Sequence, residues 1–246
     1  MSGHSKWASI KHKKAATDAK KGKAFTVAAN MITIAAKEGG GDPTMNFKLR
    51  LAIDKAKAAN MPTANIDRAV KRGTGEGGAG QVEELKYEGY GPEGVAILVS
   101  TVTDNKNRTS SEVRSTLTKN GGRMADAGSV SWMFDQQGQI VAATDSEEAQ
   151  LTAIDAGAED VEAEDGKLFI YSNVSSLSQI KSALENEGIK IESAEIIFKP
   201  ENYVKIENEE KASKILKLID ALESLDDVTE VNANFDIPEE LLEKIE

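Results

Sequence analysis

Hydrophobic residues in the first third of the chain recur at helical spacing. Between residues 25 and 36 they fall on two opposite faces, one containing Phe25 and Ile32 and the other containing Met31 and Ile34. A helix that is apolar on two sides is usually packed between other elements. We therefore expect a central helix with neighbours on both sides.

Residues that typically begin or end helices divide this region into three predicted helices. Gly39 to Gly41 end the first helix, and Asp42 followed by Pro43 predicts the cap and first position of a second. Thr63 is the expected cap of a short third helix, which Gly73 ends. A glycine-rich stretch over residues 73–80 then marks a flexible boundary.

Beyond residue 80 the pattern changes to alternating strands and helices. Residues 95–102 form a nearly continuous apolar strand, Thr109 and Glu112 predict a capping box for a helix, and residues 129–134 predict a second strand. A similar βαβ unit closes the chain, with strands at 203–206 and near 231–235 around an amphipathic helix. Between them, residues 137–200 repeat the order βαββαβ.

The economical topology joins the two outer βαβ units into one domain. The predicted class is α+β and multidomain: an N-terminal helical bundle plus two ferredoxin-like α/β domains, one inserted into the other. The expected domains are residues 1–75, residues 81–136 with 201–246, and the inserted residues 137–200. The rival is two sequential domains, which leaves a short unpaired βαβ unit at each end.

Composition restricts the compartment and the chemistry. The 246 residues include no cysteine, which removes disulfides, thiolate nucleophiles and Cys-based metal sites. The N-terminus is charged and lacks the apolar core of a signal peptide, and no apolar run is long enough to cross a membrane. We expect a cytoplasmic protein with no membrane partner; a lysine-rich organelle transit peptide is the less favoured reading of the N-terminus.

The net charge of −11 conceals two unlike parts. Residues 1–75 hold 15 Lys and Arg against 5 Asp and Glu, a net charge of +10, whereas the remainder holds 15 against 36, a net charge of −21. A basic module attracts polyanions, and an acidic body limits nonspecific binding to them.

Most of the basic charge lies near the N-terminus, where seven lysines between Lys6 and Lys23 face one acid, Asp18. Lysines that neutralise phosphates release counterions, and an indole can stack on an unpaired base. Packing on the helices is an equally good reading for the tryptophan. The candidate nucleic-acid contacts in this segment are His4, Ser5, Lys6, Trp7, Lys11, His12, Lys13, Lys14, Lys20, Lys21 and Lys23.

Two further candidates, Arg108 and Arg114, lie on or beside the helix near Thr109. Arg114 follows the apolar Val113, so it projects from the side of the helix toward a phosphate or an interdomain carboxylate. These two alternatives remain open. The turn Gly89 to Pro92 is assigned to architecture.

Enzyme signatures are missing from the sequence. The glycines of residues 73–80 lack the Lys-Ser/Thr of a phosphate-binding loop. The two histidines, His4 and His12, have no clustered acidic or cysteine partner for a metal. We predict a non-catalytic protein with no cofactor, no metal and no small-molecule substrate.

Several strings resemble the YebC family of probable transcriptional regulatory proteins over essentially the whole chain. They are GHSKWASIKHKKAATDAKKGKAF, KEGGGDP, NMP, YEGYGPEGVAILV, DNKNRTSSEVR and KNGG. The resemblance implies a three-domain fold, a cytoplasmic location, and DNA binding in transcription regulation. It also implies kinship with mitochondrial translational activators of cytochrome c oxidase and with bacterial members linked to the translating ribosome.

The leading hypothesis from the sequence is a DNA-binding transcriptional regulator whose basic module contacts the nucleic acid. The alternative is a ribosome-associated translation factor, or translational activator, that uses the same residues on ribosomal RNA. No helix-turn-helix reader stands out, which keeps this alternative close. A hydrolytic or metabolic enzyme is the least favoured class.

Overall fold

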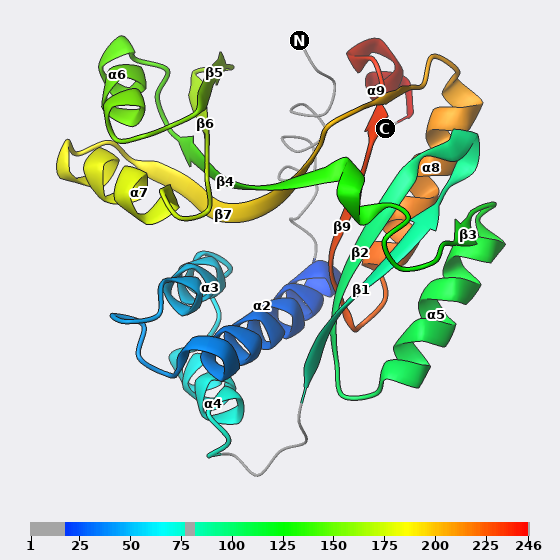
Figure 1. Cartoon of the computed structure of the whole chain (residues 1–246), viewed down its shortest axis with the longest axis horizontal. Helices are drawn as coiled ribbons and strands as arrows, with labels where there is room; N and C mark the ends of the chain where they lie inside the picture. Colours follow the sequence, from blue (N-terminus) through cyan, green and yellow to red (C-terminus); the bar gives the residue numbers. More distant parts are fainter. Residues whose placement is uncertain (1–17, 77–81, 246) are drawn as a thin grey trace. The chain divides into compact units, whose positions relative to one another are not determined.

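The computed structural model describes residues 18–76 and 82–245 of the chain. It divides into two compact units (Figure 1): the first joins residues 1–133 to residues 200–246, and the second consists of residues 134–199. The fold is mixed α+β and multidomain, as the sequence predicts.

The first unit begins with a bundle of three helices, α2 (Asp18–Gly39), α3 (Phe47–Ala58) and α4 (Thr63–Gly73). Ile32, Leu49 and Ile66 are fully or almost fully buried in its core. Ile34, on the opposite face of α2, packs with Val82 and Val102 of the following sheet region. The expectation of a central helix with apolar contacts on two sides is therefore confirmed.

The second helix starts later than the sequence signals indicate. Asp42 forms a local turn in which its Oδ1 accepts hydrogen bonds from the backbone and hydroxyl of Thr44, and α3 begins at Phe47. Asn46 is the actual cap: its Oδ1 accepts from Leu49 N, while its Nδ2 donates to the carbonyl oxygens of Ala35 and Gly40. Asn46 rather than Asp42 caps α3 because its buried side-chain amide also donates hydrogen bonds to carbonyl oxygens at the end of α2.

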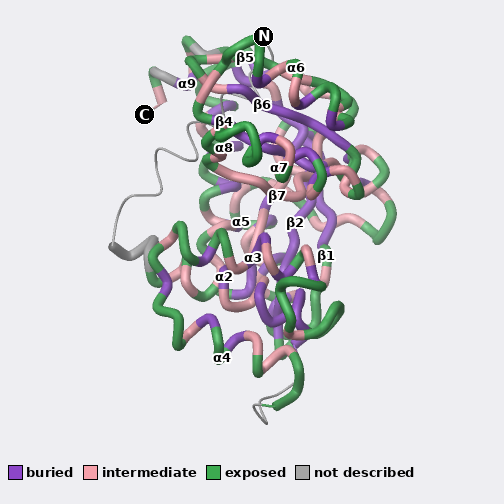
Figure 2. Tube along the Cα trace, turned by 90° about the vertical axis from the view of Figure 1, so that its left-hand side faces the viewer, coloured by how far each residue is buried: buried purple, intermediate pink, exposed green. Residues whose placement is uncertain are grey.

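A four-stranded antiparallel sheet follows, in the order β3-β1-β2-β9. Its strands are β1 (Glu83–Tyr90), β2 (Ala96–Thr103), β3 (Arg123–Met124) and β9 (Val228–Ala233). Helices α5 (Lys106–Lys119) and α8 (Glu209–Glu223) cover one face, and they share a core with the sheet around Val99, Leu117 and Ile219 (Figure 1). Strand β2 is buried along its whole length (Figure 2).

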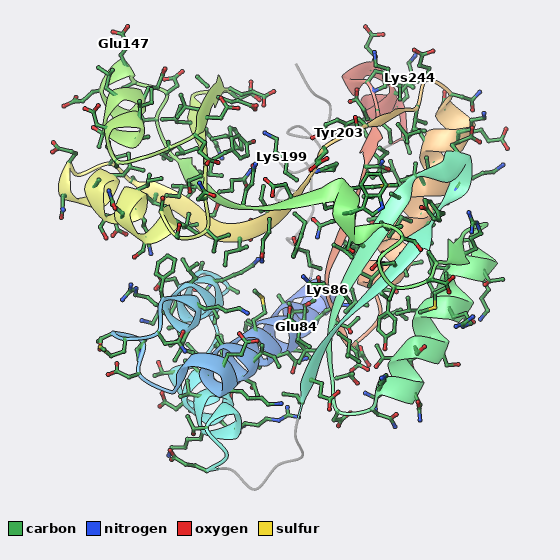
Figure 3. All side chains as sticks on the ribbon, viewed as in Figure 1. Glu84, Lys86, Glu147, Lys199, Tyr203 and Lys244 are labelled. Atoms are coloured by element: carbon green, nitrogen blue, oxygen red, sulfur yellow. The ribbon has the colours of Figure 1, made fainter. Side chains whose placement is uncertain are left out.

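The sequence did not reveal β1, and residues 203–206 take a different place from the one expected. Among the strands of residues 82–245, β8 (Val204–Lys205) pairs with β10 (Phe235–Asp236) and no other, in a small parallel sheet. Besides β9, β2 pairs with β1, whose sequence EELKYEGY is too polar at its start to show apolar alternation. The outer face of β1 carries Glu84 and Lys86 (Figure 3), and Glu84 lies 3.9 Å from Lys48 of α3.

The strand predicted over residues 129–134 is wrong except for Phe134, which begins the next strand. A short 3-10 helix, η2 (Ser131–Met133), stands there instead. The buried carboxylate of Glu88 accepts the backbone N–H groups of Gly128, Val130 and Ser131, so these donors are unavailable to a β-ladder.

The start of α5 also differs from the prediction. The cap is Asn105, whose side chain accepts from Arg108 N, rather than Thr109. The Thr109 hydroxyl is buried and donates to the carboxylate of Asp227, more than a hundred residues away in sequence.

The second unit has the chain order βαββαβ. Its elements are β4 (Phe134–Ala142), α6 (Glu147–Asp155), β5 (Asp160–Glu164), β6 (Lys167–Ser172), α7 (Leu177–Asn186) and β7 (Ile191–Pro200). The strand order β5-β6-β4-β7 is that of a ferredoxin-like sheet. Its first strand starts at Phe134, slightly before the expected boundary at residue 137.

The first unit also contains a short 3-10 helix and a helix near the C-terminus. The 3-10 helix, η1 (Pro92–Gly94), connects β1 to β2, and Glu93 within it has a left-handed φ of 61°. Helix α9 (Glu239–Ile245) packs against α8.

Candidate nucleic-acid interface

The predicted contacts near the N-terminus fall largely outside the described residues. His4, Ser5, Lys6, Trp7, Lys11, His12, Lys13 and Lys14 precede residue 18, where the description begins. Lys20 and Lys21 belong to the first turns of α2. The structure thus places the end of the basic segment at the start of the helical bundle.

Lys23 marks the point where this segment meets the sheet. Its Nζ donates a hydrogen bond to the carbonyl oxygen of Leu225, in the connection between α8 and β9. Burial lowers the pKa of Lys23, and the nearby carboxylates of Asp226 and Glu223 oppose that shift. Lys23 therefore links the basic end of α2 to the acidic turn between α8 and β9. We call residues 82–133 and 200–245, which hold this turn and the four-stranded sheet, the sheet domain.

The exposed side chain of Arg108 pairs with Asp227, a buried carboxylate. Its Nη2 lies 2.8 and 3.0 Å from the two carboxylate oxygens of Asp227, and 3.1 Å from Asp104. The hydroxyls of Thr103 and Thr109 donate to the same carboxylate. The Arg108 side chain thus has two carboxylate partners within its own chain.

These contacts determine the charge state of Asp227. Burial alone raises the pKa of its carboxyl group, but the hydrogen bonds from Thr109, Arg108 and Thr103, together with the positive charge of Arg108, outweigh burial and lower it. The hydrogen bond and charge of Asp227 in turn raise the pKa of Arg108. The ion pair holds the start of α5 against the start of β9.

Arg114 lies on the exposed side of α5. Within residues 18–76 and 82–245 its guanidinium has no ion-pair partner. It therefore remains available to a phosphate, whereas Arg108 is engaged with Asp227.

A lysine-lined hollow lies between the end of α5 and the first half of α8. We use this name for the cavity of about 620 Å³ that is bordered by Lys119, Lys211, Lys214, Lys217 and the turn at Pro92 and Glu93. Lys211 pairs with Glu93 at 2.7 Å and Lys214 with Glu210 at 2.8 Å. Lys119 and Lys217 have no such ion pair among the described residues. Four of the fifteen basic residues beyond residue 75 thus gather at one place on an acidic body.

The sequence contained a signal for this hollow that the helical pattern of α8 obscured. Lys211, Lys214 and Lys217 recur every third position, opposite the buried Ile215 and Ile219. Amphipathic helices commonly carry solvated lysines, so the spacing alone does not indicate a site. The contribution of Lys119 requires α5 and α8 to be neighbours, which only the folded sheet brings about.

Close backbone packing joins the two turns beside the hollow. A Cβ on Gly122 would lie 2.8 Å from the carbonyl oxygen of Tyr90, and one on Gly89 would lie 3.0 Å from that of Arg123. The glycines of the strings EGYGP and KNGG therefore allow β1 and the turn after α5 to touch.

Replacing Gly122 by alanine is expected to lower the free energy of unfolding by about 1–3 kcal/mol, because the new methyl group meets a backbone atom that cannot move aside. Urea unfolding followed by circular dichroism measures the change. Ser111→Ala, on the exposed side of α5, serves as the control. An unchanged midpoint for Gly122→Ala would contradict the packing argument.

The described residues contain neither a membrane-spanning helix nor a cluster of metal ligands. No helix there is both long and apolar enough to cross a membrane. No cluster of three or more His, Asp or Glu side chains in residues 18–76 and 82–245 is placed to hold a metal ion.

The architecture defines a class: multidomain α+β proteins with a helical N-terminal bundle, a sheet whose strands come from before and after an insertion, and an inserted ferredoxin-like unit. Two family models identify the member of this class. Residues 5–76 match the TACO1/YebC protein N-terminal domain, and residues 82–235 match the TACO1/YebC second and third domain. The chain belongs to the TACO1/YebC family.

Individual relatives agree with this assignment. A probable transcriptional regulatory protein of Halothermothrix orenii is 53% identical over 250 residues, covering 100% of this chain and 99% of the relative. One from Geobacter sulfurreducens is 52% identical over 247 residues, covering both chains completely. The crystal structure of a conserved hypothetical protein, Aq1575, from Aquifex aeolicus is similar with a TM-score of 0.86 and 49% identity, covering 95% of this chain and 97% of that one.

Proposed function

We propose that this protein is a non-enzymatic, cytoplasmic regulator of transcription that binds DNA through its basic N-terminal module. The observation that carries the proposal is the separation of charge, with +10 on residues 1–75 and −21 on the remainder. Counterion release at such a module gives affinity for a phosphate backbone with little dependence on sequence. The names of the relatives, probable transcriptional regulatory proteins, support a regulatory role.

The helical bundle provides the base from which this charge acts. Its three helices have a core of their own, and α2 is fixed to the acidic turn at Leu225 through Lys23. The lysines that precede Lys23 are thereby attached to a folded support at one end. The lysine-lined hollow and the exposed Arg114 offer further positive charge within the sheet domain.

The salt dependence of binding tests this proposal. The affinity of the full chain for a DNA duplex is expected to fall about 10³-fold between 50 and 200 mM salt, the fall expected for roughly six phosphate contacts. Fluorescence anisotropy of a labelled duplex measures it. A flat salt dependence, or no binding at 50 mM salt, would defeat the proposal.

Sedimentation of a lysate through a density gradient distinguishes DNA from the ribosomal alternative. For a DNA-binding regulator, the protein stays out of the ribosomal fractions at low and high salt. Salt-sensitive migration with ribosomes that is lost when Lys11, Lys13 and Lys14 are neutralised would favour a translation factor that binds ribosomal RNA.

A further inference from the structure

One loop of the sheet domain is held by a buried carboxylate. Glu88 is 7% exposed, and its two oxygens accept the backbone N–H groups of Gly128, Val130 and Ser131. The side chain of Val130 is completely buried beside them. A buried charge with three donors fixes a loop strongly, since releasing the loop would leave the carboxylate unsatisfied.

This fixed loop presents an aromatic ring to solvent. Trp132 is 61% exposed, and its Nε1 donates to the carbonyl oxygen of Ser129 at 3.1 Å. The hydroxyl of Tyr90 donates to the same oxygen at 3.2 Å, so the polar ends of the two rings converge. The guanidinium of Arg123 lies 4.8 Å from the centre of the Tyr90 ring. We call Tyr90, Arg123 and Trp132 the aromatic cluster.

The aromatic cluster and the lysine-lined hollow share two turns. Tyr90 precedes the turn that carries Pro92 and Glu93 to the hollow, and Arg123 follows the turn whose residues Asn120 and Gly121 also border it. The close approach of Gly122 to the carbonyl of Tyr90 holds these turns together. Within the cluster itself, Arg123 is the cation that lies beside an aromatic ring.

We propose that the aromatic cluster binds an unpaired nucleobase, which stacks on Trp132 while Arg123 attracts the adjoining phosphate. Flat aromatic faces beside cations are the combination by which proteins hold single strands. The inference rests on the proposed nucleic-acid binding and specifies that single-stranded segments are among the ligands.

The surroundings of Trp132 favour a base over an apolar protein surface. Its neighbours in the loop, Ser129 and Ser131, are polar, and Asp126 and Gly128 are exposed. Apolar protein contacts need a contiguous patch of apolar side chains, whereas stacking needs one flat ring held in place. The hydrogen bond from Trp132 to Ser129 and the support by Glu88 restrict the motion of this ring.

The test uses Trp132 as its own reporter. The chain has two tryptophans, so the full-length Trp7→Phe variant leaves Trp132 as the single indole. A single-stranded oligonucleotide is expected to quench its fluorescence, whereas the same strand in a duplex, or an abasic strand with the same phosphates, leaves it unchanged. Trp132→Ala is expected to weaken single-strand binding roughly 5- to 100-fold and Trp132→Phe much less, because a ring remains for stacking.

Leu151→Ala provides the matched control. Leu151 is an apolar side chain of the second unit, 60% exposed, and its truncation is expected to change neither affinity. Equal weakening of single-strand and duplex binding by Trp132→Ala overturns the proposal, as does quenching by the abasic strand. Salt-dependent binding without quenching overturns it and leaves the proposed function standing. No binding of any nucleic acid at low salt overturns both.

Discussion

Replacing Lys11, Lys13 and Lys14 by glutamine is expected to weaken DNA binding up to about 100-fold near 0.15 M salt. Each lysine that no longer neutralises a phosphate removes the release of its counterions. The slope of log affinity against log salt is therefore expected to become less steep by about 2.7 for three contacts. Titrations of the full chain by fluorescence anisotropy, at four or more salt concentrations, give both quantities.

A second triple variant separates local contact from total charge. Lys167, Lys181 and Lys190 lie in the inserted unit, and replacing them by glutamine changes the net charge by the same amount. This control is expected to retain its affinity and its salt slope. Equal losses in the two variants would show that overall charge decides binding, and no loss in the first would remove the basis of the proposed function.

Replacing Asp227 by alanine is expected to lower the free energy of unfolding by about 2–4 kcal/mol. The substitution removes the acceptor of the Thr103 and Thr109 hydroxyls and the main ion-pair partner of Arg108. Both hydroxyls are buried, so their lost hydrogen bonds are not fully replaced by water. Urea unfolding measures the loss. Asp227→Asn keeps an oxygen acceptor without the charge, so its free energy of unfolding is expected to lie between those of the natural chain and Asp227→Ala.

The contribution of Asp227 also depends on pH. Its pKa is lower in the folded protein than the roughly 3.9 of an unfolded aspartate, so the folded state favours the ionised form. The stabilisation is therefore fully present above that unfolded value and is lost as the pH falls through it toward the folded pKa. The stability difference between the natural chain and Asp227→Ala is expected to shrink on acidification over this range, and a constant difference would contradict the ion-pair account.

Periodicity in the sequence was sufficient for the helical bundle and the inserted unit. Ile32, Leu49 and Ile66 lie in one core as their spacing indicates, and the order βαββαβ survives intact. Strand β1 was not predicted, because only its second half, around Tyr87 and Glu88, is buried. The exposed first half has the acidic composition of a loop. A strand that gains its burial from distant neighbours has little local signature.

The candidate site, likewise, could be predicted only where its features are local in the sequence. Its charge could be read from composition, because counting needs no knowledge of contacts. The pairing of Arg108 with Asp227, and the meeting of Lys119 with Lys217, depend on a fold that brings residues a hundred or so positions apart together. The role of Glu88 could not be predicted for another reason. Its partners are backbone N–H groups, which nearly every residue has, so the residue types do not identify them.

The pairing of β2 with β9 has a consequence for the order in which the protein is made. About 125 residues separate the end of β2 from the start of β9, which at roughly 5–20 residues per second takes a ribosome about 6–25 s. By the end of that interval the helical bundle and the inserted unit have all their elements, whereas the edge of β2 that pairs with β9 is still unpaired. Chains released before Val228 would keep that edge open to pairing with one another, so premature termination is expected to yield aggregates rather than a smaller folded protein.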